Sequence, residues 1–389
     1  GRYSSMEGID LISQVLTALG WDANDALVKT RTVAWLGFVL AFIFGYVGNK
    51  THFCTMGAVS DIVNMNHWDR MRAWFLAIAI AIMGTSLMVW TGAIDVSKTI
   101  YTGSNFYWLA ALVGGLTFGV GMTLAGGCGQ RTLVRLGGGN LKSIVVFIFM
   151  GYAALVTLSG IFGAFRINFL QAEPVTVYLE GMQTLPALLG FDTPTGTLMV
   201  GMAIGLAMLL FVFLNKEFRS NTDNILAGIV VGLIVVIGWY VTGRFGFGED
   251  PDTLEMVYLG TNSHLAESMT FVAPLGYTMN LWAYWTDSET IVTFGVASVF
   301  GVIVGSLAYG VTHKTFRWES FNSPQDMFRH IIGAILMGFG GVTALGCTIG
   351  QGVTGISTLA VSSFLVLTAI IAGAAITMKV QYILLMREG

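Results

Sequence analysis

Two stretches of the chain resemble each other: GGLTFGVGMTLAGGCGQ at residues 114–130 and GAILMGFGGVTALGCTIGQ at residues 333–351. Aligned without a gap, they share several glycines and one cysteine, pairing Gly114 with Gly333, Gly119 with Gly338, Gly121 with Gly340, Gly127 with Gly346 and Cys128 with Cys347. In both, a glycine-rich apolar span ends in Gly-Cys and is followed by a short piece and another apolar span. Chance similarity between glycine-rich apolar helices is the weaker explanation, because the shared positions fall in one register. The sequence therefore predicts an internal repeat.

The composition indicates an integral membrane protein. Of the 389 residues, 54% are hydrophobic and only 11% are charged, and the mean hydropathy is +0.73. A soluble domain carries roughly a quarter charged residues, so this chain has too few charges to cover a water-exposed surface. Glycine lets helices approach closely in lipid, and Trp and Tyr suit the membrane interfaces. A net charge of −3 and the lack of a basic run argue against nucleic acid as a partner and leave membrane lipid as the expected surroundings.

About nine apolar stretches are long enough to cross a bilayer as helices, which takes about 20 residues. They are expected near residues 32–50, 71–94, 106–126, 142–165, 195–214, 222–243, 291–311, 326–346 and 360–386. Between some of them lie short, apolar, glycine-rich pieces at 54–64, 128–138 and 347–358. These pieces are expected to be short re-entrant helices, with ordinary connecting loops as the alternative. The predicted fold class is an all-α polytopic membrane protein.

The expected domain plan is simple. Residues 1–31 lack a continuous apolar core and are expected to form an N-terminal surface segment, followed by a single transmembrane transport domain at 32–389. Its repeat halves are placed at about 32–165 and 195–386. The positive-inside rule puts the N-terminus on the periplasmic side, the C-terminus in the cytoplasm and the acidic segment 244–290 in an extracytoplasmic loop. The Cys128 and Cys347 segments then enter from opposite sides, which predicts an inverted repeat.

The chain has three cysteines, and each opens one of the short segments. Cys54 lies in HFCTMGAVSD at 52–61, Cys128 in GGCGQRTLVRLGGGN at 126–140, and Cys347 in GCTIGQGVTGIS at 346–357. If these segments are short helices, their unpaired N–H groups and positive dipole ends face the thiols and favour an anion there. A thiol is a soft, weak hydrogen-bond donor that suits a sulfur atom. A lone cysteine is usually just a small buried hydrophobe, but the shared placement of all three favours a functional role.

Some polar residues near the cysteines have two interpretations each. Gln130 and Gln351 follow their cysteines and are candidates to donate hydrogen bonds to the oxygens of an anion; helix capping or inter-helix hydrogen bonding explains them equally well. Asp61 is either a functional membrane carboxylate or the partner of a nearby arginine such as Arg70. The arginines that follow Cys128 either attract an anion or anchor the cytoplasmic side of the membrane.

The segments FCTMGAVSD at 53–61, AGGCGQRTLVRLGGGNLKS at 125–143 and GCTIGQGVTGIS at 346–357 resemble the YeeE/YedE family, also called the sulfur-transport domain family. The resemblance extends from about residue 34 to residue 378. It implies an inverted-repeat importer of thiosulfate or a related sulfur anion in the bacterial inner membrane. It also implies a relay of cysteines along a central path, here Cys54, Cys128 and Cys347, which pass the substrate through transient S–H···S hydrogen bonds. A soluble sulfur carrier of the TusA type is the implied partner.

The chain departs from the family at one place. Family members often carry a further cysteine in the second half, where this chain reads THKTFRWESFNSPQD at 312–326. Whether Arg317 and Glu319 gate the path there is left open by the sequence.

Catalytic, cofactor and metal motifs are not evident, so no enzyme activity, cofactor or metal site is predicted. Two other function classes stay open. A membrane thiol–disulfide oxidoreductase needs pairs of cysteines that can meet, and three scattered cysteines argue against it. A membrane subunit of a larger complex would retain the packing without the transport.

Overall fold

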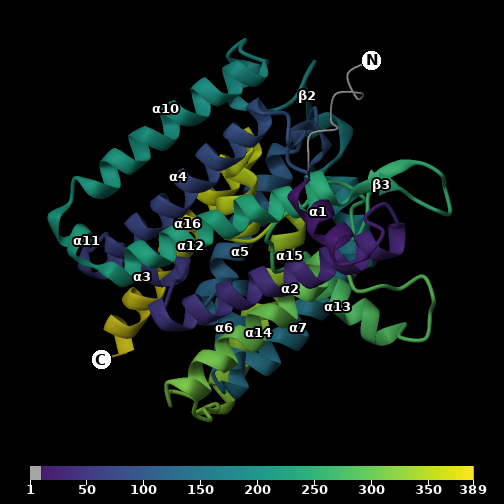
Figure 1. The fold of residues 1–389 in the computed structure, drawn as a ribbon. Coiled ribbons are helices and arrows are strands. Elements are labelled where there is room, and N and C mark those ends of the chain that lie inside the picture. The colour runs from purple at the N-terminus through teal and green to yellow at the C-terminus, as the bar shows by residue number, and fades with distance from the viewer. Residues whose placement is uncertain (1–9, 389) are drawn as a thin grey trace.

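The structure is a computed structural model that describes residues 10–388, and it is built almost entirely from helices. Within this range nine helices have 17 residues or more: α2 (Ala26–Thr51), α4 (Asp69–Trp90), α5 (Trp108–Leu124), α7 (Leu141–Ser159), α10 (Pro194–Phe213), α12 (Thr222–Tyr240), α14 (Phe294–Thr312), α15 (Pro324–Thr343) and α16 (Val361–Glu388). Each of them coincides with one of the expected spans. Figure 1 shows them gathered into one bundle, with α10 on its outside.

Shorter elements connect the long helices. They are α1 (Leu11–Ala18), α3 (Thr55–Met65), α6 (Gly129–Gly137), α8 (Ile161–Phe165), α9 (Leu185–Leu188), α11 (Lys216–Ser220) and α13 (Ala273–Ala283), the 3₁₀ turns η1 (Val96–Lys98) and η3 (Glu173–Val175), and the π-helical turns η2 (Arg166–Leu170), η4 (Val241–Phe245) and η5 (Gly350–Gly355). Two small antiparallel ribbons pair β1 (Asn105–Phe106) with β2 (Val177–Tyr178) and β3 (Phe247–Glu249) with β4 (Met256–Tyr258).

Eight segments of the described chain are both long and apolar enough to cross a membrane. The ninth long helix, α15, is 20 residues long but opens with the polar sequence PQDMFRH. The prediction of an all-α polytopic membrane protein is confirmed. Side-chain caps mark where several spans begin: Asp25 accepts the amides of Leu27 and Val28 at the start of α2, and Ser323 caps α15 just before a proline.

Helix packing follows the same plan in the two parts of the chain. α2 packs on α14 as α12 packs on α4, and α3 packs on α16 as α13 packs on α7. In the same way, the α6–α14 contact has its counterpart in the η5–α4 contact, and the α5–α16 contact has its counterpart in the α15–α7 contact. Each of these contacts has a counterpart because the six elements α2 to α7 correspond, in order, to α12, α13, α14, α15, η5 and α16. α10 has no counterpart and packs on α4 (Figure 1).

The crossing of α5 and α15 shows that the two repeat units run in opposite directions. A Cβ on Gly114 would lie 2.9 Å from the carbonyl oxygen of Gly340, and a Cβ on Gly121 would lie 2.7 Å from that of Gly333. Since Gly114 aligns with Gly333 and Gly121 with Gly340, equivalent residues exchange contacts across the crossing. This is the geometry of a two-fold axis between antiparallel helices, and the glycines allow the backbones to meet.

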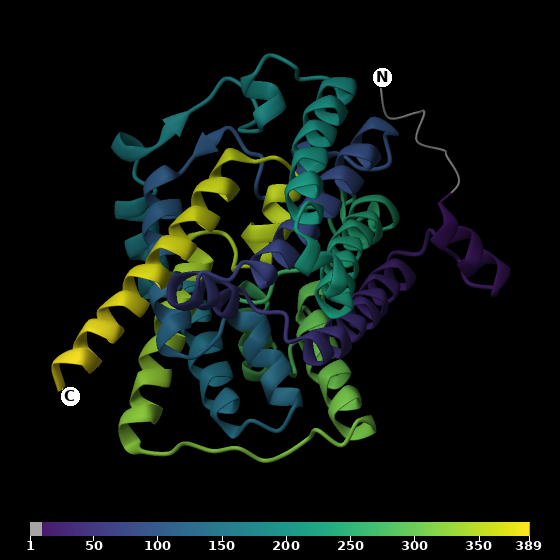
Figure 2. The ribbon, with the colours of Figure 1, turned by 90° about the vertical axis from the view of Figure 1, so that its left-hand side faces the viewer.

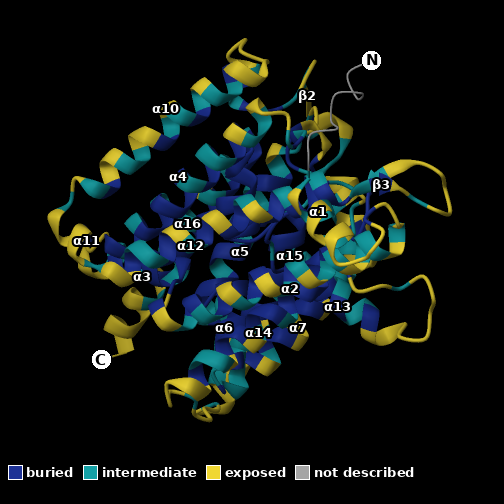
Figure 3. Ribbon diagram, in the orientation of Figure 1, coloured by how far each residue is buried: buried dark blue, intermediate teal, exposed yellow. Residues whose placement is uncertain are grey.

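The core of the bundle surrounds this crossing. Figure 3 shows α5 and α15 mostly buried, whereas α10 alternates mainly between intermediate and exposed residues along its length. In Figure 2, α1 lies at the opposite side of the molecule from the C-terminal end of α16. Fully buried large side chains such as Phe118 and Met122 on α5 fill the space beside the crossing. The centre of the protein is therefore closed by close packing.

Three expected segments take a more detailed form in the structure. Of the N-terminal segment 1–31, residues 1–9 lie outside the described residues, α1 is exposed along most of its length, and α2 already begins at Ala26. Segment 244–290 contains the β3–β4 ribbon, a buried stretch and α13, which packs on α7. Of the three short pieces, 54–64 and 128–138 form α3 and α6, whereas 347–358 forms the single π-helical turn η5. The side of the membrane that each loop faces stays a prediction.

Candidate functional site

The chain changes direction in the same way at each cysteine. A long helix ends, one residue takes a left-handed backbone conformation, and the cysteine follows two positions later. The left-handed residues are His52 (φ 54°), Gly126 (φ 73°) and Leu345 (φ 62°). Cys54 then caps α3 through its sulfur, and Cys128 occupies the N-cap position of α6 without a side-chain capping hydrogen bond.

Backbone amides face two of the sulfur atoms. The amide of Gly57 donates to the Sγ of Cys54 over 3.5 Å, and the amide of Gly350 donates to the Sγ of Cys347 over 3.3 Å. In each case the donor lies three residues after the cysteine, as in an ordinary N-cap. The partial positive charge of these amides therefore lies at the thiols of Cys54 and Cys347, as expected for two of the three segments; the Cys128 sulfur accepts no such capping hydrogen bond.

The fold brings the cysteine segments together at the centre of the bundle. The thiol of Cys54 lies beside the thiol of Cys128, and Cys128 lies beside the hydroxyl of Thr348. Thr348 adjoins Cys347, whose thiol lies beside the hydroxyl of Thr270. All three cysteines are buried and none forms a disulfide. The sequence argument against paired cysteines does not hold for Cys54 and Cys128, because residues far apart in the chain meet in the fold.

Threonines complete this line of polar atoms. The hydroxyl oxygen of Thr55 is buried and has no hydrogen-bond partner, and the buried hydroxyls of Thr270 and Thr348 have only the neighbouring thiols of Cys347 and Cys128 beside them. A buried hydroxyl with no partner, or with only a weak thiol partner, keeps hydrogen-bonding capacity unused, so these atoms indicate a place where a polar ligand fits. Sequence reasoning missed Thr270. It precedes α13, which corresponds to α3 in the repeated packing, so an extension of the repeat to the whole chain is the signal that would have found it.

The two glutamines mainly hold the bends in place. The Nε2 of Gln130 donates to the carbonyl oxygen of Phe53 over 3.0 Å, and its buried Oε1 has no partner. The Nε2 of Gln351 donates to the carbonyl oxygen of Ala344 over 2.7 Å, and its Oε1 accepts from Ser363 over 2.5 Å. These two hydrogen bonds fit the inter-helix hydrogen-bonding alternative for Gln351, and its place in the substrate pathway stays a prediction. Gln130 ties the Cys54 and Cys128 segments to each other.

A basic cavity opens at one end of the cysteine line. It measures about 710 Å³ and lies where α5 ends and α15 begins. Its cationic side chains are Arg131, Arg135, Lys142, Lys314 and Arg317. We call this cavity the basic vestibule. The vestibule residue Arg131 lies near both Cys54 and Cys128. It forms no ion pair with any described residue.

Arg317 and Glu319, whose role the sequence left open, lie at the rim of the basic vestibule. They pair with each other at 3.2 Å, and the Arg317 side chain is 81% exposed. The amide of Leu141 donates to the carbonyl oxygen of Glu319 over 2.8 Å, which fixes this segment against the α6–α7 turn. Both residues thus lie at the exposed rim of the vestibule, whereas the three cysteines are buried.

Two smaller cavities lie at the opposite end of α5 and α15. One, of about 280 Å³, is lined by neutral polar groups, including the buried and unpaired oxygens of Gln183, Thr343 and Ser362. The other, of about 170 Å³, is lined by Arg166, Glu267 and Thr270 among others. With 17 residues in α5, the two ends are separated by about 25 Å. The buried thiols lie between cavities that open on opposite faces.

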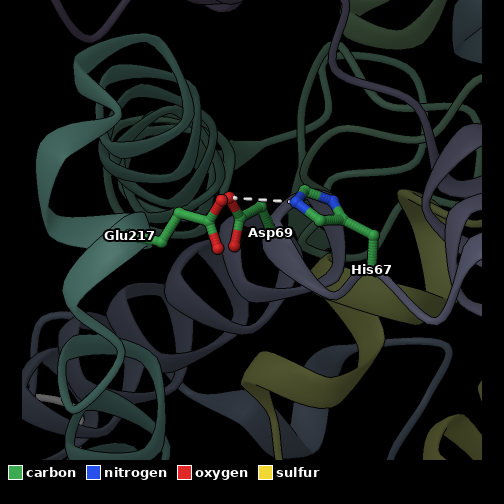
Figure 4. A group of neighbouring side chains, drawn as sticks. All are labelled: His67, Asp69 and Glu217. Atoms are coloured by element: carbon green, nitrogen blue, oxygen red, sulfur yellow. Dashed lines mark ion pairs between the residues drawn. The ribbon is translucent and has the colours of Figure 1, made fainter.

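Other charged groups lie outside this line. Asp61 is buried and accepts two hydrogen bonds from Arg70, at 2.6 and 2.9 Å, so the pairing alternative describes it. Among the described residues, one group could hold a metal ion: His67, Asp69 and Glu217, whose ligand atoms lie within 4.8 Å of one another (Figure 4). Asp69 already pairs with His67 at 3.6 Å. The group includes none of the predicted site residues, and the absence of a functional metal stays a prediction.

Together, the bundle, the opposed cavities and the closed polar line between them define a polytopic membrane transporter. The model of the sulphur transport family matches residues 50–376, so the chain belongs to that family. It is 25% identical over 348 residues to the thiosulfate transporter TsuA of Spirochaeta thermophila, covering 85% of this chain and 94% of that protein. It is 24% identical over 334 residues to the thiosulfate transporter TsuA of Escherichia coli strain K12, covering 81% and 85%. The expected family and the expectation of a transporter rather than an enzyme are confirmed.

Proposed function

We propose that the protein imports thiosulfate or a closely related sulfur anion across the bacterial inner membrane. The observation that carries this proposal is the line of buried thiols and hydroxyls between the basic vestibule and the cavities at the opposite end. The relatives named thiosulfate transporters support the choice of substrate. A thiol is a soft group, and it suits the terminal sulfur of thiosulfate better than it suits an oxyanion without one.

Cys54, Cys128 and Cys347 act as successive weak binding stations in this proposal. Each thiol can donate an S–H···S hydrogen bond to the terminal sulfur of the substrate. The amides of Gly57 and Gly350 offset the negative charge of the substrate beside Cys54 and Cys347. Conduction needs stations that bind weakly and in series, because a tightly held ion does not leave. No covalent bond forms or breaks. Gln130 and Gln351 position the cysteine segments.

The positive-inside rule supports the topology of the proposal. It places the basic vestibule and the C-terminus in the cytoplasm and the N-terminus in the periplasm. The anion then enters through the small cavities near Arg166 and leaves past Arg131. The transport domain comprises two inverted halves, at about 32–165 and 195–386, whose repeated units α2–α7 and α12–α16 meet at the α5–α15 crossing, with α10 outside the repeat. A soluble sulfur carrier of the TusA type is the proposed acceptor on the cytoplasmic side.

Growth on thiosulfate tests this function. The test uses a bacterial strain that lacks its own thiosulfate importers and receives thiosulfate as the sole sulfur source. The strain expresses the intact chain, Cys128→Ala or Cys347→Ala, each at equal membrane abundance. Rescue by the intact chain and loss in both variants supports the proposal. Rescue that persists in both variants refutes the relay, and no rescue by the inserted wild-type chain refutes the function.

A thiol–disulfide oxidoreductase is the second candidate, because Cys54 and Cys128 meet in the structure. It requires a reversible disulfide between them. Mass spectrometry of the protein after mild oxidation and after reduction separates the two functions. A Cys54–Cys128 disulfide that cycles while thiosulfate uptake is absent would favour the redox function. A membrane subunit without transport would show no uptake defect in any cysteine variant.

A further inference from the structure

Arg166 occupies an unusual position at the end of the molecule opposite the basic vestibule. It is the first residue of the π-helical turn η2, directly after α7 and α8. Its Nε is buried and has no hydrogen-bond partner, and none of the ion pairs among the described residues includes it. A half-buried guanidinium with an unpaired donor is costly unless a ligand accepts from it. π-Helical turns are often found at functional sites.

The cavity beside Arg166 has the size and lining of a small-anion site. Its volume of about 170 Å³ equals the space of about five or six water molecules in the liquid. Tyr277 lies in its wall, near Arg166. Guanidinium and hydroxyl groups are the donors that oxyanions prefer, and arginine binds them in a forked geometry.

The same cavity reaches the cysteine line through Thr270. Thr270 lines the cavity, and its hydroxyl lies beside the thiol of Cys347. An anion here would therefore have donors for its oxygens at one end and a thiol near its other end. This polarity distinguishes an oxyanion that carries a terminal sulfur from one that carries oxygens only.

One carboxylate shares the cavity and opposes tight binding. The Oε1 of Glu267 accepts from the amide of Ser263 over 3.0 Å and from its hydroxyl over 2.7 Å, and Glu267 does not pair with Arg166. Glu267 therefore lines the same space as the guanidinium without forming an ion pair with it. In its ionised form Glu267 repels an anion that Arg166 attracts, and this opposition keeps the site from holding the anion too tightly to release it.

We propose that Arg166, together with Tyr277 and Thr270, forms a binding site for a sulfur-terminated oxyanion at the mouth of the pathway opposite the basic vestibule. Arg166 and Tyr277 hold the oxygens, and Thr270 directs the sulfur end toward Cys347. Arg166 is thus the residue that sets substrate affinity at the entry side. This inference rests on the proposed transport of thiosulfate and adds the place and orientation of its first contact.

Uptake of external thiosulfate by cells expressing the full chain tests the site. Arg166→Gln is expected to raise the half-saturating thiosulfate concentration about tenfold or more, because a charge-assisted contact is lost. Arg166→Lys keeps the charge without the fork and is expected to fall between Arg166→Gln and wild type. Lys98→Gln is the matched control, because Lys98 is exposed, lies on the same proposed side and does not line the cavity.

The outcomes separate the two levels of the proposal. Absence of thiosulfate uptake by wild type overturns the proposed function itself. Uptake by wild type with an unchanged half-saturating concentration in Arg166→Gln overturns only the Arg166 site. If Arg166→Gln does not insert at normal abundance, the half-saturating thiosulfate concentration of Arg166→Lys is compared with that of wild type instead, and an unchanged value overturns the site. Competition gives a second readout: sulfate, which offers oxygens alone, is expected to inhibit wild type and to inhibit Arg166→Gln less, and equal inhibition contradicts the site.

Discussion

The α5–α15 crossing offers a direct test of the packing that positions the cysteines. Gly340 of α15 faces α5, and a Cβ added there would lie 2.6 Å from both the carbonyl oxygen of Gly114 and the amide nitrogen of Phe118. Both are backbone atoms, so neither can move aside as a flexible side chain would. Ordinary contact begins at 3.4 Å, so Gly340→Ala requires the helices to separate by 0.8 Å (3.4 − 2.6).

The cost of this separation follows from the behaviour of close-packed interiors. Forcing one extra carbon into a filled core typically costs about 1–3 kcal/mol, because the neighbouring contacts weaken together. At roughly 2 °C of melting temperature per kcal/mol for a large domain, Gly340→Ala is expected to lower the melting temperature by about 2–6 °C. Transport is expected to fall as well, because α5 leads into the Cys128 bend and α15 into the Cys347 bend.

Thermal unfolding of the detergent-purified protein measures the effect. Gly103→Ala is the matched control, because Gly103 does not have a positive φ and nothing lies within 4 Å of its added Cβ. The control is expected to melt at the wild-type temperature or slightly above it, since alanine restricts the unfolded chain. Equal melting temperatures for Gly340→Ala and Gly103→Ala would refute the close antiparallel crossing.

Four further substitutions test individual contacts. Burial raises the pKa of Glu267 above its ordinary 4.5, so its contribution to stability is present at low pH and lost as pH rises through the raised pKa. Glu267→Gln should flatten this dependence, and melting curves of both proteins across the acidic to neutral range that stay parallel would contradict it. Gln351→Ala should cost about 1–3 kcal/mol because it strands two buried partners, and Gln130→Ala should cost less because only one is lost; chemical unfolding gives the order, and the reverse order would count against these assignments. Asp61→Asn should destabilise by about 1–3 kcal/mol, below the cost for a fully buried pair because the Arg70 side chain is 38% exposed; a melting temperature equal to that of wild type would show that the pair is not formed.

The sequence predicted the features that depend on local patterns. Apolar length located the nine long helices, because a membrane helix must carry its hydrophobic residues in one run. The shared register of Gly114 and Gly333 predicted the repeat, because close helix crossing requires glycine at fixed positions. The Gly-Cys pattern located the bends at Cys128 and Cys347.

Features that depend on contacts across the fold were beyond the sequence. The meeting of Cys54 and Cys128 joins segments that are far apart in the chain, and no local pattern encodes it. Thr270 lies in an unremarkable loop sequence, and its position beside Cys347 appears only when the packing of α13 is matched to that of α3. Arg166 reads as an ordinary interfacial arginine until the unpaired Nε and the cavity beside it are seen.

Uptake of radiolabelled thiosulfate into proteoliposomes that contain the purified protein tests the central claim most directly. Wild type is expected to accumulate label above empty liposomes. Cys128→Ala and Cys347→Ala, which remove the two repeat-related thiols, are each expected to lose most of that uptake while melting near the wild-type temperature. Uptake at the wild-type rate by both folded variants would contradict the claim that the buried cysteines form the path.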